Sequence, residues 1–423
     1  MKSVKIKIER LGAIRDSEIS IKQLMLFTGE SGLGKSYAAF LVHYFYVLLL
    51  TDRFKYFFSE KNIDFSNILK GRKSGENLLV INTKELFEWI NKDAVVFIGY
   101  LIGHKLDGEV KYEIPYTEKR LKFVYNEEIF GLYNNEEVYY RISLNSLVYR
   151  IASDSYNSSY TPFLELLKAE LVLNIFEGEE RIRNVYLMPP SRGALMELDE
   201  KPNFRSGMYD EFFKLKAALI RPLSNPPVIP PTLIEMLSKV NDGTLDRVNG
   251  NWMYYTNGGA EIPLTAAASS IKELAPFTYY IGKYSAKDSS ILLEEPEAHL
   301  HPSRQSHLAD LIAYTYNEGC HLQITTHSDY FLKRLNHLIR LNLLKYRLDD
   351  STEFKDLLKK WSINEKCLIN PINIATYLFI RNDDGTSKIE RKFVSVDNQI
   401  SFDSFYNTVM NDIELTSDIN QFY

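Results

Sequence analysis

The feature that most constrains this chain is a glycine-rich loop placed between an apolar strand and an apolar helix. Residues 24–28 (LMLFT) are typical of a buried strand, and they run directly into the loop GESGLGKS at residues 29–36. The apolar run from Tyr37 to Leu50 predicts a buried helix. The loop matches the phosphate-binding pattern G-x-x-x-x-G-K-[S/T] at every fixed position. This order of strand, loop and helix predicts an α/β fold with the loop at a strand end.

The residue types of this loop suit a nucleotide. Glycines let backbone N–H groups curl around phosphate oxygens, and the following helix N-terminus favours anions. Lys35 is expected to reach the β- and γ-phosphates, and the Ser36 hydroxyl to ligate Mg²⁺. The sequence therefore predicts ATP and Mg²⁺ as ligands. The predicted binding residues are Gly29, Glu30, Ser31, Gly32, Leu33, Gly34, Lys35, Ser36 and Tyr37.

Two later apolar strands end in residues that can complete such a site. The segment ILLEEP ends in two carboxylates, of which Glu294 is assigned to the metal and Glu295 to the attacking water. His327 ends the apolar segment LQITTH, where an imidazole could contact a γ-phosphate. A histidine at a strand end is more often structural, so the polar neighbours of His327 carry this assignment. The predicted catalytic residues are Lys35, Glu295 and His327, and the predicted metal ligands are Ser36 and Glu294.

The spacing of these motifs predicts the domain organisation. Lys35 and Glu295 are 260 residues apart, an interval that compact P-loop kinases and GTPases do not usually need. Both ends must nevertheless meet in one sheet. We therefore expect residues 1–50 and 251–423 to form one ATPase core, interrupted by an insertion at 51–250. Within the insertion, 110–145 is predicted to be β-rich and 146–240 a helical arm.

Composition limits the remaining function classes. The chain has 423 residues and a formal net charge of -5, which excludes a polycationic nucleic-acid coat protein but not a local basic groove. Two cysteines cannot form a disulfide framework, and the charged start has no signal-peptide core, so a cytoplasmic location is expected. The longest apolar run is too short to span a bilayer, and no membrane partner is expected. Tyr (28) and Phe (24) are abundant, which suits strand faces and also protein–protein surfaces.

Several segments together resemble a known family. The chain resembles the standalone SMC/ABC-type ATPases that are related to RecF and to the ATPase part of the OLD nucleases. The most specific stretches are ILLEEPEAHLHPSRQ at 291–305 and ITTHSDYFLKRL at 324–335, supported by 4–36, 186–195, 262–277 and 393–407. The resemblance implies an ABC/SMC-type ATPase head with a mixed β-sheet core, an N-terminal antiparallel β-lobe and a helical insertion. It covers both ends of the chain well and the middle poorly.

The resemblance also implies residue roles. The segment TAAASSIKELAPF matches the signature region that contacts the γ-phosphate from an opposing subunit, which places Ser269, Ser270 and Lys272 in the binding set. Read from the residues alone, the same segment is a helix start capped by its two serines. The wider superfamily has glycine after the serine pair, where this chain has Ile271. Arg192 matches an arginine that could touch phosphates or a neighbouring subunit, and a surface position is nearly as probable.

The family comparison leaves three functional hypotheses. The first is an ATP-hydrolysing homodimer or higher homo-oligomer that sandwiches ATP and acts as sensor or switch in a prokaryotic anti-phage defence system, with a separately encoded nuclease or toxin as effector. The second is a nucleotide-gated scaffold with little hydrolysis, favoured by Ile271 and by the lack of any glutamine between Gln23 and Gln305. The third is a RecF-like repair ATPase, for which DNA binding is unsupported because the basic residues are scattered. No nuclease (TOPRIM) motif follows His327.

Overall fold

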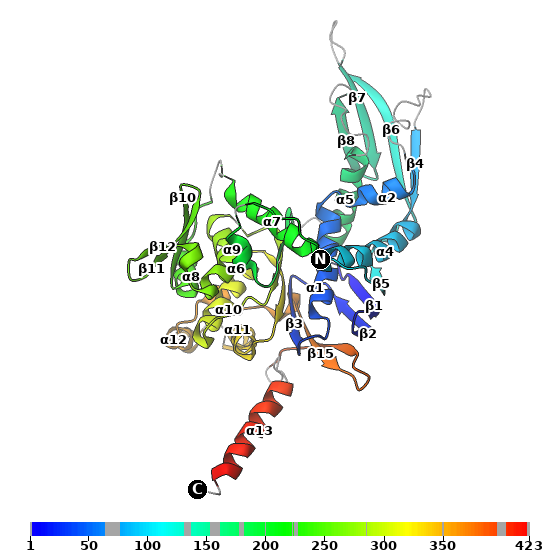
Figure 1. Ribbon diagram of the computed structural model, residues 1–423. Coiled ribbons are helices and arrows are strands. Elements are labelled where there is room, and N and C mark those ends of the chain that lie inside the picture. The colour runs from blue at the N-terminus through cyan, green and yellow to red at the C-terminus, as the bar shows by residue number, and fades with distance from the viewer. Residues whose placement is uncertain are drawn as a thin grey trace.

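The computed structural model describes most of the chain. The described residues are 2–63, 77–130, 137–152, 161–176, 182–198, 200–221, 223, 227–284, 286–348, 351–395 and 403–420. They form a central sheet with helices on both faces, from which a β-rich arm and one C-terminal helix project (Figure 1). The predicted α/β class with a mixed sheet is confirmed.

The central sheet has nine strands in the order β5-β1-β2-β16-β15-β3-β14-β13-β9. The five strands from β15 to β9 are parallel to one another, and the strands at the β5 end pair mainly antiparallel. The strand of the glycine-rich loop, β3, lies beside the histidine strand β14, which lies beside the acidic strand β13. The strands are β1 (Lys5–Leu11), β2 (Ile14–Ser20), β3 (Leu24–Gly29), β5 (Gly108–Glu113), β9 (Asn184–Met188), β13 (Ser289–Glu294), β14 (His321–Thr326), β15 (Ile374–Arg381) and β16 (Ser387–Lys392).

The central strands are apolar on both faces because helices cover both faces of the sheet. On β3, Met25 and Phe27 point into one core, and Leu24 and Leu26 point into the other. The first core contains helix α1 (Lys35–Leu50), and the second contains the helices that follow residue 190. Such continuous apolar runs are expected of parallel strands buried on two sides.

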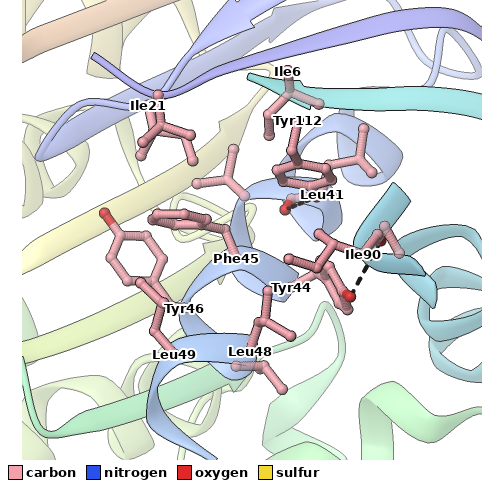
Figure 2. Close-up of a cluster of buried hydrophobic side chains, with 14 of the residues drawn as sticks. Ile6, Ile21, Leu41, Tyr44, Phe45, Tyr46, Leu48, Leu49, Ile90 and Tyr112 are labelled. Atoms are coloured by element: carbon pink, nitrogen blue, oxygen red, sulfur yellow. Dashed lines mark hydrogen bonds between the residues drawn. The ribbon is translucent and has the colours of Figure 1, made fainter. Parts of the chain in front are cut away.

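Helix α1 is buried around almost its whole circumference. It contacts β3, β9, β13 and β14 of the sheet and also α4 (Thr83–Ile102) and α5 (Thr161–Phe176). Figure 2 shows Leu41, Tyr44 and Phe45 packed among strand and helix side chains. The hydroxyls of Tyr44 and Tyr112 donate to the backbone oxygens of Ile90 and Leu41, so their polar atoms are satisfied inside the core.

The arm is a four-stranded antiparallel sheet in the order β4-β6-β7-β8, with α2 (Phe54–Glu60), α4 and α5 beside it (Figure 1). Its strands are β4 (Asn77–Asn82), β6 (Arg120–Phe130), β7 (Glu137–Leu144) and β8 (Leu147–Ala152). The expectation that helix begins at residue 146 is wrong, because 147–152 is a strand paired with β7. Leu147, Tyr149 and Ile151 alternate with more exposed residues, the period of a strand.

The interval from 51 to 250 also contributes to the central sheet. Strand β5 pairs with β1 at one edge, and β9 forms the opposite edge beside β13. The chain thus passes through the central sheet at β5 and again at β9. Strands β4, β6, β7 and β8 form the separate arm. The division of the chain at residues 50 and 250 remains a prediction.

The second core is mainly helical. A small sheet of β10 (Gly243–Val248), β11 (Asn251–Thr256) and β12 (Glu261–Pro263) precedes α9 (Ser269–Lys283). Helices α10 and α11 flank β14 in sequence. The remaining elements are α6 (Arg192–Met196), α7 (Gly207–Ile220), α8 (Pro231–Asn241), η2 (Leu264–Ala266), α10 (Pro302–Asn317), α11 (Asp329–Leu348), α12 (Thr352–Lys360), η3 (Glu365–Cys367), η4 (Pro371–Asn373) and α13 (Asp403–Asn420). Among the described residues, no helix combines the length and apolarity that crossing a bilayer requires.

Candidate functional site

The glycine-rich loop joins β3 to α1 in the predicted order. Gly29, Gly32 and Gly34 all have positive φ values, of 128°, 78° and 93°. At Gly29 a Cβ atom would lie 2.6 Å from the backbone oxygen of Phe379, and at Gly34 it would lie 2.8 Å from the Ile14 side chain. Glycine is therefore required here by conformation and by close packing. Glu30 and Ser31 are exposed and Leu33 is buried, so the loop presents its backbone to solvent and anchors one side chain.

Lys35 lies folded against the loop that it follows. Its ammonium group donates to the backbone oxygens of Gly29 at 3.0 Å and Glu30 at 2.7 Å. Burial lowers the pKa of Lys35 to about 8, while the nearby carboxylates of Glu295, Glu297 and Glu294 act in the opposite direction. A nucleotide phosphate would offer this ammonium group a stronger acceptor than two carbonyls.

The acidic strand β13 brings Glu294 to the start of α1. Glu294 is 3% exposed, and the Ser36 hydroxyl hydrogen-bonds its carboxylate. Burial raises the pKa of Glu294 to about 7; Glu295 also raises it, and Ser36, Arg192 and Lys35 lower it. The two predicted metal ligands, 258 positions apart in the sequence, are therefore in direct contact.

Glu295 and His327 face each other at the ends of neighbouring strands. His327 Nε2 lies 3.6 Å from Glu295 Oε1, and the two side chains are 34% and 45% exposed. Burial lowers the pKa of His327, as does Lys35, so the imidazole is held in its neutral form at neutral pH. Glu295 has φ of 44°, and its N–H donates to Thr325, which turns the chain away from the strand at this residue. An accessible carboxylate beside a neutral imidazole is suited to orienting or deprotonating water.

Glu297 is a residue that the sequence analysis left without a role in the site. Its Oε1 accepts hydrogen bonds from the Thr326 hydroxyl at 2.6 Å and from the His327 N–H at 2.8 Å. The side chain is 7% exposed, and burial raises its pKa. Glu297 thus fixes the backbone of the histidine strand where it leaves the sheet. Its place in the segment EEPE gave no signal that it would turn inward.

Gln305 is a second residue that was not predicted. It lines an open hollow of about 340 Å³ together with Glu295, Glu297, His327 and Tyr330. Its amide donates to Leu300 O at 2.9 Å, and its Oε1 accepts from the Ser328 hydroxyl. Ser328 in turn accepts from the Phe331 N–H at the start of α11. The chain therefore places a glutamine at the site from the C-terminal side of the acidic strand.

Arg192 is not a surface residue, and the expectation of a phosphate or subunit contact is corrected. Its side chain is fully buried, and its guanidinium donates to three backbone oxygens, those of Pro189, Glu273 and Glu294, at 3.1, 2.6 and 2.7 Å. Burial lowers its pKa, and the surrounding glutamates, Glu273 first, raise it. Arg192 therefore ties α6, α9 and the end of the acidic strand together behind the site.

The segment that resembles a signature region begins helix α9, but its serines do not cap it. The N-cap residue is Ala268, and Ser269 and Ser270 are the first two helical residues. Ser269 is exposed and Ser270 is 8% exposed. Lys272 pairs with Glu197 at 2.7 Å. Ile271 and Lys272 donate the first hydrogen bonds of the helix to Ala268 O, so the N–H groups of Ser269 and Ser270 precede the intrahelical ladder.

Two further contacts support the glycine-rich loop. Arg381, at the end of β15, lies 3.5 Å from the Glu30 carboxylate and 3.5 Å from Ser31 O. The Tyr37 ring lies where a Cβ on Gly12 would fall, so the turn between β1 and β2 packs closely on the start of α1. The Arg381 contact could not be read from the sequence, because its partners come from opposite ends of the chain.

The residues present fit a nucleotide with Mg²⁺. A hydroxyl and a buried carboxylate in contact, Ser36 and Glu294, are the two oxygen donors that a magnesium ion with remaining water or phosphate ligands requires. Among the described residues, no group of three or more His, Cys, Asp or Glu side chains could hold a metal alone. A bound magnesium ion would supply charge neutralisation for phosphate oxygens. The chain itself would supply a phosphate cradle, a cation at Lys35 and a water-orienting carboxylate at Glu295.

The fold and this geometry define a P-loop ATPase-type core, in which a loop, an acidic strand and a histidine strand lie side by side. The family profile described as "AAA ATPase domain" matches residues 111–332, slightly more than half of the chain. The chain belongs to this family. The matched interval contains the acidic strand and His327 and begins after the glycine-rich loop. No curated protein matches the sequence.

The solved structures that are similar to this chain include three SMC head domains. One, an SMC head bound to the C-winged helix domain of ScpA, has a TM-score of 0.38 and 12% identity and covers 93% of this chain and 98% of its own. An SMC head from Thermotoga maritima has a TM-score of 0.34 and 10% identity, and it covers 92% of this chain and 99% of its own. An SMC head with an extended coiled coil, bound to a ScpA domain derived from Pyrococcus furiosus, has a TM-score of 0.40 and 12% identity. It covers 98% of this chain and 99% of its own.

Proposed function

We propose that this protein binds ATP with Mg²⁺ and hydrolyses it. The observation that carries the proposal is the convergence of Lys35, Glu294 and Glu295 with His327 at the adjoining ends of three neighbouring strands. These residues lie in three separate stretches of the sequence. A structural role for each one alone would not require them to share one rim of the sheet.

Each side chain takes a role that its environment supports. Lys35, whose pKa burial lowers to about 8, leaves its two carbonyl acceptors for the β- and γ-phosphates. Ser36 and Glu294 hold the magnesium ion. Glu295 accepts the proton of the attacking water, and neutral His327, 3.6 Å from it, orients that water or a phosphate oxygen.

The proposal includes composite sites between two copies of the chain. The unpartnered start of α9 at Ser269 and Ser270 is suited to contacting a phosphate held by another copy. In this arrangement Lys272 remains bound to Glu197 or exchanges it for phosphate. Hydrolysis at such sites would couple nucleotide state to assembly.

A scaffold with little hydrolysis is the second candidate. Its supporting observation is that the glutamine nearest the site, Gln305, has both ends of its amide engaged by Leu300 and Ser328. A glutamine held in this way is not free to sense a magnesium ion or water. ATP would then fix the oligomeric state without being consumed at an appreciable rate.

At the cellular level we propose a sensor or switch subunit of a prokaryotic anti-phage defence system, with a separately encoded nuclease or toxin as effector. This rests on the resemblance of 291–305 and 324–335 to SMC/ABC-type ATPases. A cytoplasmic location is part of the proposal and is supported by two buried, unpaired cysteines, Cys320 and Cys367. A RecF-like repair role would instead require duplex DNA to stimulate turnover.

The test compares three single variants of the full chain. Lys35→Ala is expected to abolish ATP binding, measured by the ATP-induced shift in thermal unfolding. Glu295→Gln is expected to keep binding and to lower steady-state phosphate release by about 100-fold or more. Glu9→Gln is the control, because Glu9 is an exposed carboxylate on β1 and lies outside the predicted binding set. The assignment is wrong if Lys35→Ala still binds ATP. Turnover at the background level in the unaltered chain, with ATP-dependent assembly, would favour the scaffold.

A further inference from the structure

A groove with an apolar floor and a basic rim runs along helix α11. It has a volume of about 690 Å³ and is closed on its other sides by α10, α12 and the segment after α12. The floor is formed by Leu341, Leu344, Leu357 and Ile363. Trp361 lies at the edge with 62% of its surface exposed. An apolar surface of this kind, left open to solvent, marks a site for a partner.

The rim of this groove is positively charged. Lys333, His337, Arg340 and Arg347 follow one another along one face of α11 at helical spacing, and Arg334 lies beside them. Arg334 is held by Asp310 in a two-point ion pair, and Lys333 is paired with Asp329. Among the groove-lining residues, every ionisable side chain is a Lys, Arg, His or Tyr. The groove therefore suits an acidic ligand with apolar side chains.

Helix α13 has the complementary composition. Its sequence DSFYNTVMNDIELTSDIN contains four acidic residues and no lysine or arginine. Ile413 and Leu415 are 55% and 58% exposed. Figure 1 shows α13 projecting alone from the body, and no described element makes an extended contact with it. An isolated helix of this length is marginal in water, so α13 needs a surface to pack on.

The two elements also match in length. From Tyr330 to Arg347 the groove follows seventeen helical steps of α11, which corresponds to roughly 26 Å. Helix α13 has 18 residues, or about 27 Å. Because α13 points away from its own body, a second copy is the surface that it can meet.

We propose that α13 of one copy docks into the groove between α10, α11 and α12 of a second copy. Ile413 and its apolar neighbours occupy the floor, and Asp412, Glu414 and Asp418 face the basic rim. The groove adjoins the candidate active site, because Tyr330 lines both the groove and the hollow that contains Glu295 and His327. Docking therefore places one copy's C-terminal helix beside the other copy's nucleotide site. This association is separate from an ATP sandwich.

A cross-linking experiment tests which surface α13 meets. Two full-length chains with different tags are mixed without nucleotide, one carrying Leu344→Cys in the groove and the other Ile413→Cys in α13. The native Cys320 and Cys367 are buried, and burial raises the pKa of both thiols, so they contribute little background. A short bis-maleimide is expected to join the two tagged chains. Leu78→Cys replaces Leu344→Cys in the control, because Leu78 is 57% exposed and lies on the arm. Equal yield with this control, or cross-linking only within one chain that carries both cysteines, would overturn the proposal.

A charge exchange tests the chemistry of the contact. Arg340→Glu is expected to weaken self-association about 10-fold in analytical ultracentrifugation, because it replaces an attractive contact with a like-charge one. Asp412→Arg in the same chain is expected to restore it. Both measurements are repeated on Lys35→Ala, so that loss of nucleotide binding and loss of docking are read separately. Association that ignores Arg340→Glu, or that Asp412→Arg weakens further, would contradict docking in this groove.

Discussion

The buried carboxylate of Glu294 should cost stability at neutral and alkaline pH, and replacing it should recover that stability. Glu294 is 3% exposed, and burial raises its pKa from 4.5 to about 7. Unfolding returns the carboxyl group to water, where it loses its proton at much lower pH. Its folded-state pKa is the higher one, so its contribution to stability is present below about pH 4.5 and is lost as pH rises through about 7.

The size of the effect follows from the two pKa values. One pKa unit corresponds to about 1.4 kcal/mol, so the full difference amounts to about 3 kcal/mol. At pH 8 nearly all of this is expressed, whereas at pH 5 less than about 1 kcal/mol is expressed. Glu294→Gln keeps the shape of the side chain and an acceptor for the Ser36 hydroxyl but cannot ionise. Its gain in unfolding free energy over the unaltered chain should therefore grow by about 2 kcal/mol from pH 5 to pH 8.

The assay is denaturant unfolding of the full chain without nucleotide at several pH values. Glu9→Gln is the control, because Glu9 is an exposed carboxylate on β1 and is not among the groups that shift the pKa of Glu294. The control should show no comparable rise across this range. If Glu294→Gln destabilises the protein at pH 8, or gives the same change at pH 5 and pH 8, then the carboxyl group is not held in the environment described here. With Mg²⁺ and ATP present the gain should shrink, because the metal stabilises the ionised carboxylate that the variant lacks.

Four other substitutions test the supporting residues. Arg192→Ala should lower the unfolding free energy by about 3 kcal/mol, because it strips three buried carbonyls of their donor; a loss below about 1 kcal/mol in denaturant unfolding would contradict this role. Gly34→Ala should weaken ATP binding more than Gly32→Ala in calorimetric titration, since both have positive φ but only Gly34 lacks space for a Cβ atom. Glu297→Ala should cost about 1–3 kcal/mol and lower turnover more than ATP affinity, because it frees the backbone of His327; equal losses of both would show that it acts on binding.

Much of the site could be predicted from local sequence pattern combined with one topological rule. The apolar strand before Gly29 and the helix after it follow from residue type alone. The rule that parallel strands share a carboxyl-end edge then predicts that Glu295 and His327 lie near Lys35, although the sequence separates them by hundreds of residues. The structure places all three strands side by side, with Thr325 opposite Glu294 and Thr326 opposite Thr28.

The errors arose where a segment's partner decides its structure. Residues 147–152 have apolar residues that fit a helix start as well as a strand, and only the hairpin with β7 selects the strand. Ser269 and Ser270 are favourable N-cap residues, but the N-cap is the residue before them, Ala268, and the serines are already helical. The local preference was real in both cases, and tertiary packing overrode it.

Arg192 shows most clearly what a sequence does not contain. An arginine after a Pro-Pro-Ser turn is ordinarily exposed, and only the approach of three carbonyls from separate segments makes its burial tolerable. Two of those carbonyls belong to Glu273 in α9 and Glu294 in β13. The helix that begins with Ser269 and the strand that ends with Glu294 are therefore held by one guanidinium. Any displacement of α9 by a second copy must either carry the end of β13 with it or break a buried, charge-assisted hydrogen bond, and the second outcome is the costlier one.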